Sequence, residues 1–237
     1  MGNACPEQDI LYIFELDDYF TRVKHHKKKI AFIIACMRHF ARMLRDKGYQ
    51  VRYFALDDSN TPTNLSDALL LMRQEHTNTP IVITAPSEYP DYACTRQFAE
   101  QNPSLVRILD DNRFMCSIDA FKTWAGDKKQ LRMEFFYRVM RKQHAILMDG
   151  DAPVGDKWNF DSDNRKPPKH GLDVPVPYTH APDSITQEAI DLVNARYADH
   201  FGDMQPWYFA TTRVQALSAL KLFIKTRLAL FGDYQDA

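Results

Sequence analysis

The chain has 237 residues, of which 45% are hydrophobic and 12% aromatic, and its formal net charge is -1. This composition is too apolar for a disordered chain and can supply one good core, with room for a small second module. A charge near zero excludes a global attraction to nucleic acid, so such a contact would need a local basic patch. The sequence contains no apolar run of about 18 residues and no signal-peptide pattern, so no membrane span is expected.

The first half of the chain alternates β-type runs with helix-type patterns. The longest helix pattern places apolar residues at i, i+3, i+4 and i+7, and Gly48 follows it as a terminator. Asn64 is placed to cap the next helix. We predict strands over 10–16, 51–56, 80–84 and 105–109, and helices over 27–47, 65–75 and 91–101. The alternation predicts an α/β fold, a Rossmann-like parallel sheet flanked by helices, with ligands outside the carboxyl ends of its strands.

The pattern changes after residue 115 to a helical extension. Helices are predicted over 117–124, 128–142, 185–198 and 214–231, and the second of them is strongly basic on its polar side. Residues 149–169 are polar and irregular, and 171–183 form a proline-rich linker. We therefore predict an α/β domain over 1–125, a helix with an irregular linker over 126–183, and a helical part over 184–237.

The sequence carries few signs of chemistry. It lacks the glycine-rich phosphate loops and the nucleophile elbow, so no catalytic residue is predicted. The four cysteines lie far apart without metal-binding spacing, and we expect them to be reduced in a cytoplasmic protein: Cys5, Cys36, Cys94 and Cys116. No metal site is predicted.

A basic run, His25 to Lys29, opens the longest helix pattern. The two adjacent histidines could be metal ligands, but neighbouring side chains point apart and no H-x-x-x-H partner exists, so a basic patch is favoured. Lysines at a helix start oppose the helix dipole. Lys27, Lys28 and Lys29 therefore form either a solvated face or a contact for a phosphate or an acidic partner.

Two further patterns have a chemical and a structural interpretation. The acidic pairs 57–58 and 110–111 resemble acid/base groups, but carboxylates after strands are ordinary turn formers. The aromatic run at Trp158 to Phe160 could stack on a base or on another domain, or it could pin an irregular loop.

Several long strings resemble one protein family. They are HHKKKIAF, MRHFA, KQLRMEFFYR, LMDGD-PVG-KWNFD-DNRKP and FGDYQDA, where a dash marks a position outside the resemblance. The chain looks like a member of the prokaryotic photolyase-related family, the iron–sulfur bacterial cryptochromes and (6-4) photolyases, over residues 6–237. The resemblance implies a light-dependent flavoprotein that repairs pyrimidine photoproducts in damaged DNA or senses blue light. It also implies an N-terminal domain with the antenna 6,7-dimethyl-8-ribityllumazine, and a helical domain with FAD and a [4Fe–4S] cluster.

The chain departs from the family at both ends. Family members begin with a central strand and a Gly-Asp-Gln-Leu-type loop that have no counterpart here, so a gap or a new strand pairing is expected. The FAD-binding domain and the cluster cysteines would lie beyond residue 237. The expectation is a truncated member that alone binds neither cofactor and repairs no DNA, and whose partner is the missing FAD-binding domain. Alternatives are a stand-alone chromophore module and a structural remnant that aggregates through exposed strand edges.

The resemblance also implies site residues. Positions matching the family's antenna pocket are Phe14, Glu15, Tyr19, Arg22 and Ile33, with Glu88 in a later strand-end loop. The family usually has Glu and Tyr where this chain has Tyr19 and Arg22. Contacts to DNA phosphates or to the missing domain are expected from the basic and aromatic residues Lys128, Arg132, Arg138, Trp158, Arg165 and Lys166.

Overall fold

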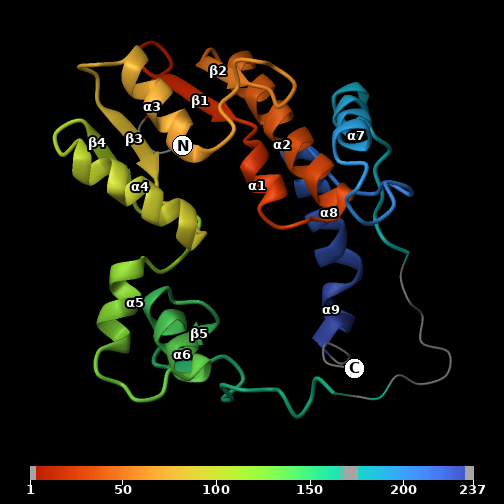
Figure 1. The fold of residues 1–237 in the computed structure, drawn as a ribbon. Coiled ribbons are helices and arrows are strands. Elements are labelled where there is room, and N and C mark those ends of the chain that lie inside the picture. Colours follow the sequence, from red (N-terminus) through yellow and green to blue (C-terminus); the bar gives the residue numbers. More distant parts are fainter. Residues whose placement is uncertain (1–3, 166, 168–175, 233–237) are drawn as a thin grey trace. The chain divides into compact units, whose positions relative to one another are not determined.

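The computed structural model describes residues 4–165, 167 and 176–232 of the chain (Figure 1). It divides into two compact units. The first unit comprises Met1–Glu75 and Gly171–Leu230, and the second comprises His76–His170 and Phe231–Ala237. The first unit is therefore built from two stretches that are far apart in the sequence. This division does not test the domain boundaries predicted at residues 125 and 183, which stay a prediction.

The N-terminal stretch of the first unit is a strand–helix–strand arrangement. Its elements are β1 (Ile10–Phe14), α1 (Asp17–Thr21), α2 (Lys27–Asp46), β2 (Gln50–Phe54) and α3 (Leu65–Glu75). β1 and β2 pair in parallel, with Ile10 opposite Gln50 and Phe14 opposite Phe54. Parallel neighbours need a crossover, and α2 provides it. The carboxyl ends of both strands consequently meet at the same edge of the ladder.

Helix α2 has a clear start and a clear end. At its start, Nδ1 of His26 accepts a hydrogen bond from the N–H of Lys28 at 3.0 Å, which satisfies one free donor of the first turn. At its end, Gly48 has φ +83°, a left-handed conformation that glycine adopts without strain, as the sequence predicted. One face of the helix is buried, through Ile30, Ala31, Ile34, Ala35, Ala41 and Leu44.

The C-terminal stretch of the first unit contributes α7 (Ser184–Arg196), α8 (Arg213–Thr226) and α9 (Leu228–Phe231). Helix α7 packs on α2 (Figure 1). Ala189, Ile190 and Val193 share one hydrophobic cluster with Ala31 and Ala35 of α2, and the alanines on both helices permit a short distance between their axes. Tyr197, Met204 and Trp207 complete that cluster. The core of the first unit therefore needs both stretches of the chain.

The turn after α7 fits tightly against the start of α2. The N–H of Lys27 donates to the carbonyl of Phe201 at 3.1 Å, and the His26 ring meets the Phe201 ring edge to face. Gly202 has φ +88°, and a Cβ there would lie 2.0 Å from the Nε2 atom of His26. Only glycine fits at this position. His26 thus serves the packing of the α2 start. Among the described residues, no group of three or more His, Cys, Asp or Glu could hold a metal ion.

The second unit contains its own parallel ladder and a helical part. Its elements are β3 (Ile81–Thr84), α4 (Tyr89–Gln101), β4 (Val106–Leu109), α5 (Ile118–Ala125), α6 (Met133–Gln143), β5 (Met148–Asp149) and β6 (Ala152–Pro153). β3 pairs with β4 in parallel, and α4 is the crossover. β5 and β6 form a minimal antiparallel hairpin. Phe121 and Trp124 of α5 pack against Phe136 of α6, at ring-centroid distances of 5.2 and 4.9 Å.

The predicted fold class is confirmed: parallel strands are flanked by helices, and helical elements follow them. The predicted single sheet differs in that each unit holds its own two-stranded parallel ladder. The N-cap at Asn64 is also confirmed, because its Oδ1 accepts the N–H of Asp67 at 3.0 Å. Within the part of the chain that the structure describes, no helix combines the length and the apolar character needed to cross a bilayer.

Candidate functional site

A polar cavity of about 290 Å³ lies in the first unit, where β1 and β2 end. Its walls come from the residues that follow β1, from the loop that follows β2, and from the last residue of α7. The lining residues are Glu15, Asp17, Leu56, Asp57, Asp58, Ser59, Thr61, Pro62, Thr63 and Arg196. This is the edge where parallel sheets bind ligands, so we take this cavity as the candidate site.

Glu15 contributes to the wall of the cavity but is occupied within the protein. Its side chain is fully buried, and Arg38 of α2 donates to its two oxygens at 2.8 and 3.1 Å. Oε2 also accepts the N–H of Leu56 at 2.7 Å, and the Tyr53 hydroxyl donates to Oε1. Burial and the neighbouring Glu15 carboxylate raise the pKa of Tyr53, which therefore stays a neutral donor. Glu15 joins β1, β2 and α2, and its acceptor sites are taken.

Asp17, the first residue of α1, is hydrogen-bonded to residues at the end of α7. Its Oδ1 accepts from Nε of Arg196 at 3.0 Å and from the Tyr197 hydroxyl at 2.7 Å. Burial and the Asp17 carboxylate raise the pKa of Tyr197, so this hydroxyl also remains protonated. The contact places Arg196 at the cavity, the one cation among its lining residues.

The loop after β2 supplies the exposed acceptors of the site. Asp58 shapes this loop, since its N–H donates to the carbonyl of Ala55 at 3.0 Å and its Oδ1 accepts from the N–H of Asn60 at 2.9 Å. Asp57 lies 3.5 Å from Nη2 of Arg38, with 59% of its side chain exposed. The 57–58 pair is thus part of a turn, the structural interpretation of the sequence. No nucleophile paired with a base occurs among the lining residues.

The chemistry of the cavity is that of a hydrogen-bond acceptor. Carboxylates at 17, 57 and 58 and the hydroxyl side chains at 59, 61 and 63 surround it, and its apolar lining is limited to Leu56 and Pro62. Such a set accepts hydrogen bonds from a neutral ligand with several hydroxyl groups. Phosphate-bearing ligands would meet repulsion from the carboxylates.

The predicted antenna residues do not converge on this cavity, with the exception of Glu15. Phe14 stacks on Phe54 with centroids 4.7 Å apart, and Tyr19 meets Phe20 edge to face at 5.4 Å. Arg22 pairs with Asp18 at 3.0 Å, one helical turn away. Ile33 packs against the core of the first unit, and Glu88 is the N-cap residue of α4 in the second unit.

Of the ten lining residues, sequence reasoning singled out Glu15 and the acidic pair 57–58; it named neither Asp17 nor Arg196. The acidic residues directly after the first strand were a usable signal for Asp17, because side chains after a strand reach the ligand-binding edge. Nothing in the sequence brings Arg196 to the same place, since that requires α7 to dock on α2.

The predicted basic surface lies in the second unit and is largely engaged in internal contacts. Arg138 forms an ion pair with Glu134 at 2.6 Å and lies over the Trp158 ring, 5.4 Å from its centroid. Lys128 lies over the Trp124 ring at 5.0 Å, and Arg132 over the Phe135 ring at 6.0 Å. Arg165 is exposed, and Lys166 lies outside the described residues.

Trp158 holds the irregular segment after the hairpin to α6. Besides Arg138, two more cations of α6 lie over its ring, Arg141 at 5.2 Å and Lys142 at 5.8 Å. Arg141, which sequence reasoning missed, is 6% exposed and donates to the carbonyls of Ile146 and Leu147. This arrangement matches the interpretation of the aromatic run as a pin for the loop.

Comparisons with known proteins match this chain to a family model and to related proteins. The family model described as "Deoxyribodipyrimidine photo-lyase-related protein" matches residues 1–209. A (6-4) photolyase of Agrobacterium fabrum is 41% identical over 231 residues, which cover 98% of this chain and 46% of that protein. An uncharacterized protein of Acanthamoeba polyphaga mimivirus is 25% identical over 166 residues, covering 67% of this chain and 82% of that protein.

The chain spans less than half the length of the (6-4) photolyase that it resembles. The family match extends over the strands, the cavity and helix α7, and it ends at residue 209, before α8 begins. The extent of the match establishes the family: this chain belongs to the deoxyribodipyrimidine photolyase-related proteins.

Proposed function

We propose that this chain is the antenna-chromophore part of a light-dependent photolyase-related flavoprotein, and that the cavity after β1 and β2 holds the polar chain of the pigment. The observation that supports this is the acceptor-rich lining at 17, 57, 58, 59, 61 and 63. The ribityl chain of 6,7-dimethyl-8-ribityllumazine carries neutral hydroxyl groups, which such acceptors bind. The volume of about 290 Å³ is at the lower end for a ligand pocket. It suits the polar chain better than the ring.

In the proposed whole protein, electron transfer would involve an iron–sulfur cluster, and the cysteines of this chain do not fit one. The four cysteines of the chain are free, and they lie at positions 5, 36, 94 and 116 on separate segments. Among the described residues, no group of three or more His, Cys, Asp or Glu could hold a metal, so no step through a [4Fe–4S] cluster is assigned to them. The proposal places repair of pyrimidine (6-4) photoproducts, or blue-light sensing, in the whole protein.

Pigment binding by the purified full chain tests the antenna proposal. The chain is titrated with 6,7-dimethyl-8-ribityllumazine, whose fluorescence changes on binding, and riboflavin 5′-phosphate serves as a phosphate-bearing comparison. Asp58→Asn removes a lining charge but keeps the oxygen that accepts the N–H of Asn60, and it should weaken binding about tenfold, the size of one charge-assisted hydrogen bond. Asp119→Asn, an exposed carboxylate in the second unit, is the matched control. No binding by the wild-type chain contradicts the proposal and favours the structural-remnant alternative.

A second proposal concerns the exposed apolar helix α8. None of its residues is buried, and Val214, Leu220 and Ile224 are at least half exposed. The (6-4) photolyase relative is more than twice as long as the matched region. We infer that α8 packs against a further helical part, the FAD-binding domain that the family resemblance implies. Co-expression with the corresponding C-terminal half of that relative should give a stable complex, which Leu220→Asp should abolish.

A third proposal concerns the basic residues of the second unit. Contacts to DNA phosphates, or to the further domain, are proposed for Lys128, Arg132, Arg138, Arg165 and Lys166. A phosphate contact predicts that binding of a damaged oligonucleotide weakens with salt, with a slope reduced by about one for each cation removed. Because Arg138 is already paired with Glu134, its removal should change the slope less than removal of Arg132.

A further inference from the structure

A second cavity of the first unit, of about 410 Å³, has walls from α2, β2 and α7. Three arginines of α2 line it, and they stand at i, i+4 and i+7, a spacing that places them on one side of the helix. The opposite walls come from one tyrosine of β2 and from the first turns of α7. The residues are Arg38, Arg42, Arg45, Tyr53, Ile185 and Glu188. A cavity of this size can hold a small molecule.

Two of the three guanidinium groups are held in place by the protein and keep unused donors. Nε and Nη2 of Arg38 donate to Glu15 at 2.8 and 3.1 Å, and only 16% of this side chain is exposed. Nη2 of Arg45 donates to the carbonyl of Val51 at 3.3 Å. Nη1 of both arginines has no hydrogen-bond partner among the described residues. Donors that are fixed before binding lose little entropy when a ligand arrives.

The third guanidinium group is free, and the charge of the lining is mixed. Arg42 is exposed and, in the part of the chain that the structure describes, has no hydrogen-bond or ion-pair partner. Asp46 and Glu188 also line the cavity, but neither forms an ion pair with its arginines within the described ranges. Glu15 offsets the charge of Arg38 from behind the wall. Attraction for an anion therefore comes from Arg42 and Arg45, and binding should be of modest affinity.

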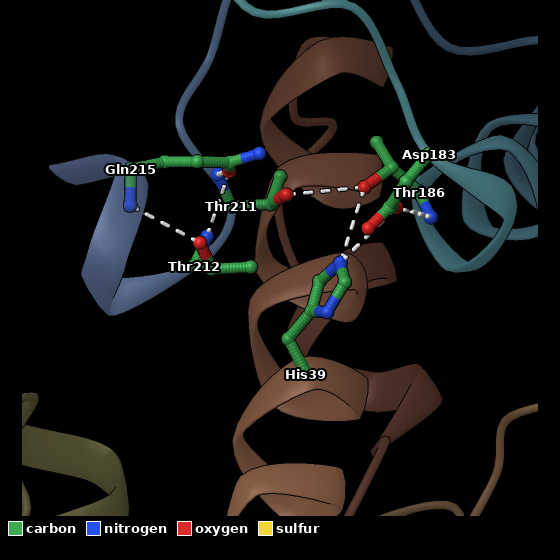
Figure 2. Close-up of polar contacts among 6 residues, drawn as sticks. All are labelled: His39, Asp183, Thr186, Thr211, Thr212 and Gln215. Carbon is green, nitrogen blue, oxygen red and sulfur yellow. Dashed lines mark hydrogen bonds and ion pairs between the residues drawn. The ribbon is translucent and has the colours of Figure 1, made fainter.

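The α7 wall is fixed on α2 by a chain of polar contacts (Figure 2). Nε2 of His39 on α2 lies 3.2 Å from Oδ1 of Asp183, which caps α7 by accepting the N–H of Thr186 at 2.9 Å. The hydroxyls of Thr186 and Thr211, both buried, lie 3.1 Å apart and extend the chain toward the start of α8. Glu188, in the first turns of α7, consequently has a defined position at the cavity.

The donors and the apolar lining together select a class of ligand. Guanidinium groups match phosphate oxygens with paired, charge-assisted hydrogen bonds. Ala41, Ile185 and the ring of Tyr53 form an apolar part of the wall. The Tyr53 hydroxyl already donates to Glu15, so the ring is what this residue offers to a ligand. A phosphate with a small apolar body uses both parts, whereas a neutral polyol uses neither.

We propose that the cavity lined by Arg38, Arg42 and Arg45 binds a phosphate monoester with a small apolar or aromatic body. It is a different cavity from the one after β1 and β2, whose carboxylates repel phosphate. The two cavities have no lining residue in common. This inference is therefore independent of pigment binding.

Calorimetric titration of the full chain with phenyl phosphate tests the site, in a phosphate-free buffer of low ionic strength. Inorganic phosphate lacks the apolar body and should bind more weakly, and phenol lacks the charge and should not bind measurably. Arg42→Gln should weaken binding of phenyl phosphate about tenfold, the size of one charge-assisted hydrogen bond. Arg213→Gln, which alters an exposed arginine of α8 that lines neither cavity, is the matched control and should bind as the wild type does.

A variant with the opposite effect locates the bound anion and keeps the test decisive if Arg42→Gln folds poorly. Glu188→Gln removes a carboxylate that repels phosphate from the α7 wall, so it should tighten binding about two- to threefold at low ionic strength. Excess 6,7-dimethyl-8-ribityllumazine should not displace phenyl phosphate. The proposal would be overturned by absence of binding to the wild type, by equal affinities of the wild type and Arg42→Gln, by unchanged or weaker binding in Glu188→Gln, or by displacement.

Discussion

Helices α7 and α8 begin with the same chemistry but differ in what they bury. Each has a side-chain N-cap, Asp183 in α7 and Thr212 in α8, and they are 13 and 14 residues long. Four residues of α7 are buried, whereas none of α8 is. A cap fixes where a helix begins and adds about 1 kcal/mol, but tertiary packing supplies most of a helix's stability. The two helices should therefore respond very differently to similar changes.

The largest expected effect comes from breaking the ion pair that joins Glu15, which follows β1, to Arg38 of α2. Glu15→Gln removes the fully buried charge that pairs with Arg38 and leaves that largely buried guanidinium with only the exposed Asp57, at 3.5 Å, as a counter-ion. Breaking a buried pair in this way costs about 3–5 kcal/mol of unfolding free energy. Urea unfolding followed by circular dichroism measures it. Glu100→Gln, which breaks an exposed pair with Arg96, should change the same quantity by less than about 0.5 kcal/mol.

A matched pair of truncations compares the two helices directly. Ile190→Ala removes a side chain that is 2% exposed, and should lower the unfolding free energy by about 2–4 kcal/mol. Leu220→Ala in α8 removes a side chain that is 51% exposed, and should change it by about 0.5 kcal/mol or less. Equal losses in the two variants would show that α8 is packed in solution.

Removal of the N-caps of α7 and α8 should give smaller losses of stability that again differ between the two helices. Asp183→Ala and Thr212→Ala should each cost about 1 kcal/mol at the helix start. In α7 this loss should appear in global unfolding, because its first turn belongs to the packed core. In α8 it should appear as faster hydrogen exchange of the first turn with little change in global stability. A global effect of Thr212→Ala as large as that of Asp183→Ala contradicts this distinction.

The last prediction concerns the reactivity of one thiol rather than the free energy of unfolding. Burial raises the pKa of Cys36 on α2 to about 11, so at pH 9 only about one in a hundred of these thiols is ionised. Alkylation of Cys36 at pH 9 should therefore be about fiftyfold slower in the folded chain than in urea, and should accelerate as the pH rises toward 11. Mass spectrometry of the labelled peptide measures this rate. Ile190→Ala should raise it, and Leu220→Ala should leave it unchanged.

Strands and helices could be predicted from the sequence where their burial produces a regular pattern of apolar residues. Strand runs and helix periodicity located four strands and most helices, because alternating burial produces those patterns. The short helix α1 and the β5–β6 hairpin were missed, since each is too short to show a period. The basic helix begins at Met133 rather than at 128, and the last predicted helix is interrupted at Arg227, between α8 and α9.

The site was less predictable because it depends on distant segments. Glu15 was identified, but the sequence gives no sign that Arg38, Tyr53 and Leu56 take up its oxygens. Arg196 reaches the cavity only after α7 docks on α2. Tyr19 and Arg22, which the resemblance places at a ligand, contact their sequence neighbours Phe20 and Asp18, and their role in ligand binding stays a prediction.

The division of the first unit over two stretches has a consequence for how the protein forms. Its hydrophobic cluster joins Phe20 and Ile30 to Val193 and Trp207, across more than 150 residues of chain. During synthesis from the N-terminus, the long stretch of the second unit, His76–His170, is made before this cluster can close. Contacts of such sequence separation are costly to form early and slow down folding. β1, α2 and β2 must therefore wait, with their apolar face uncovered, until the last third of the chain has left the ribosome.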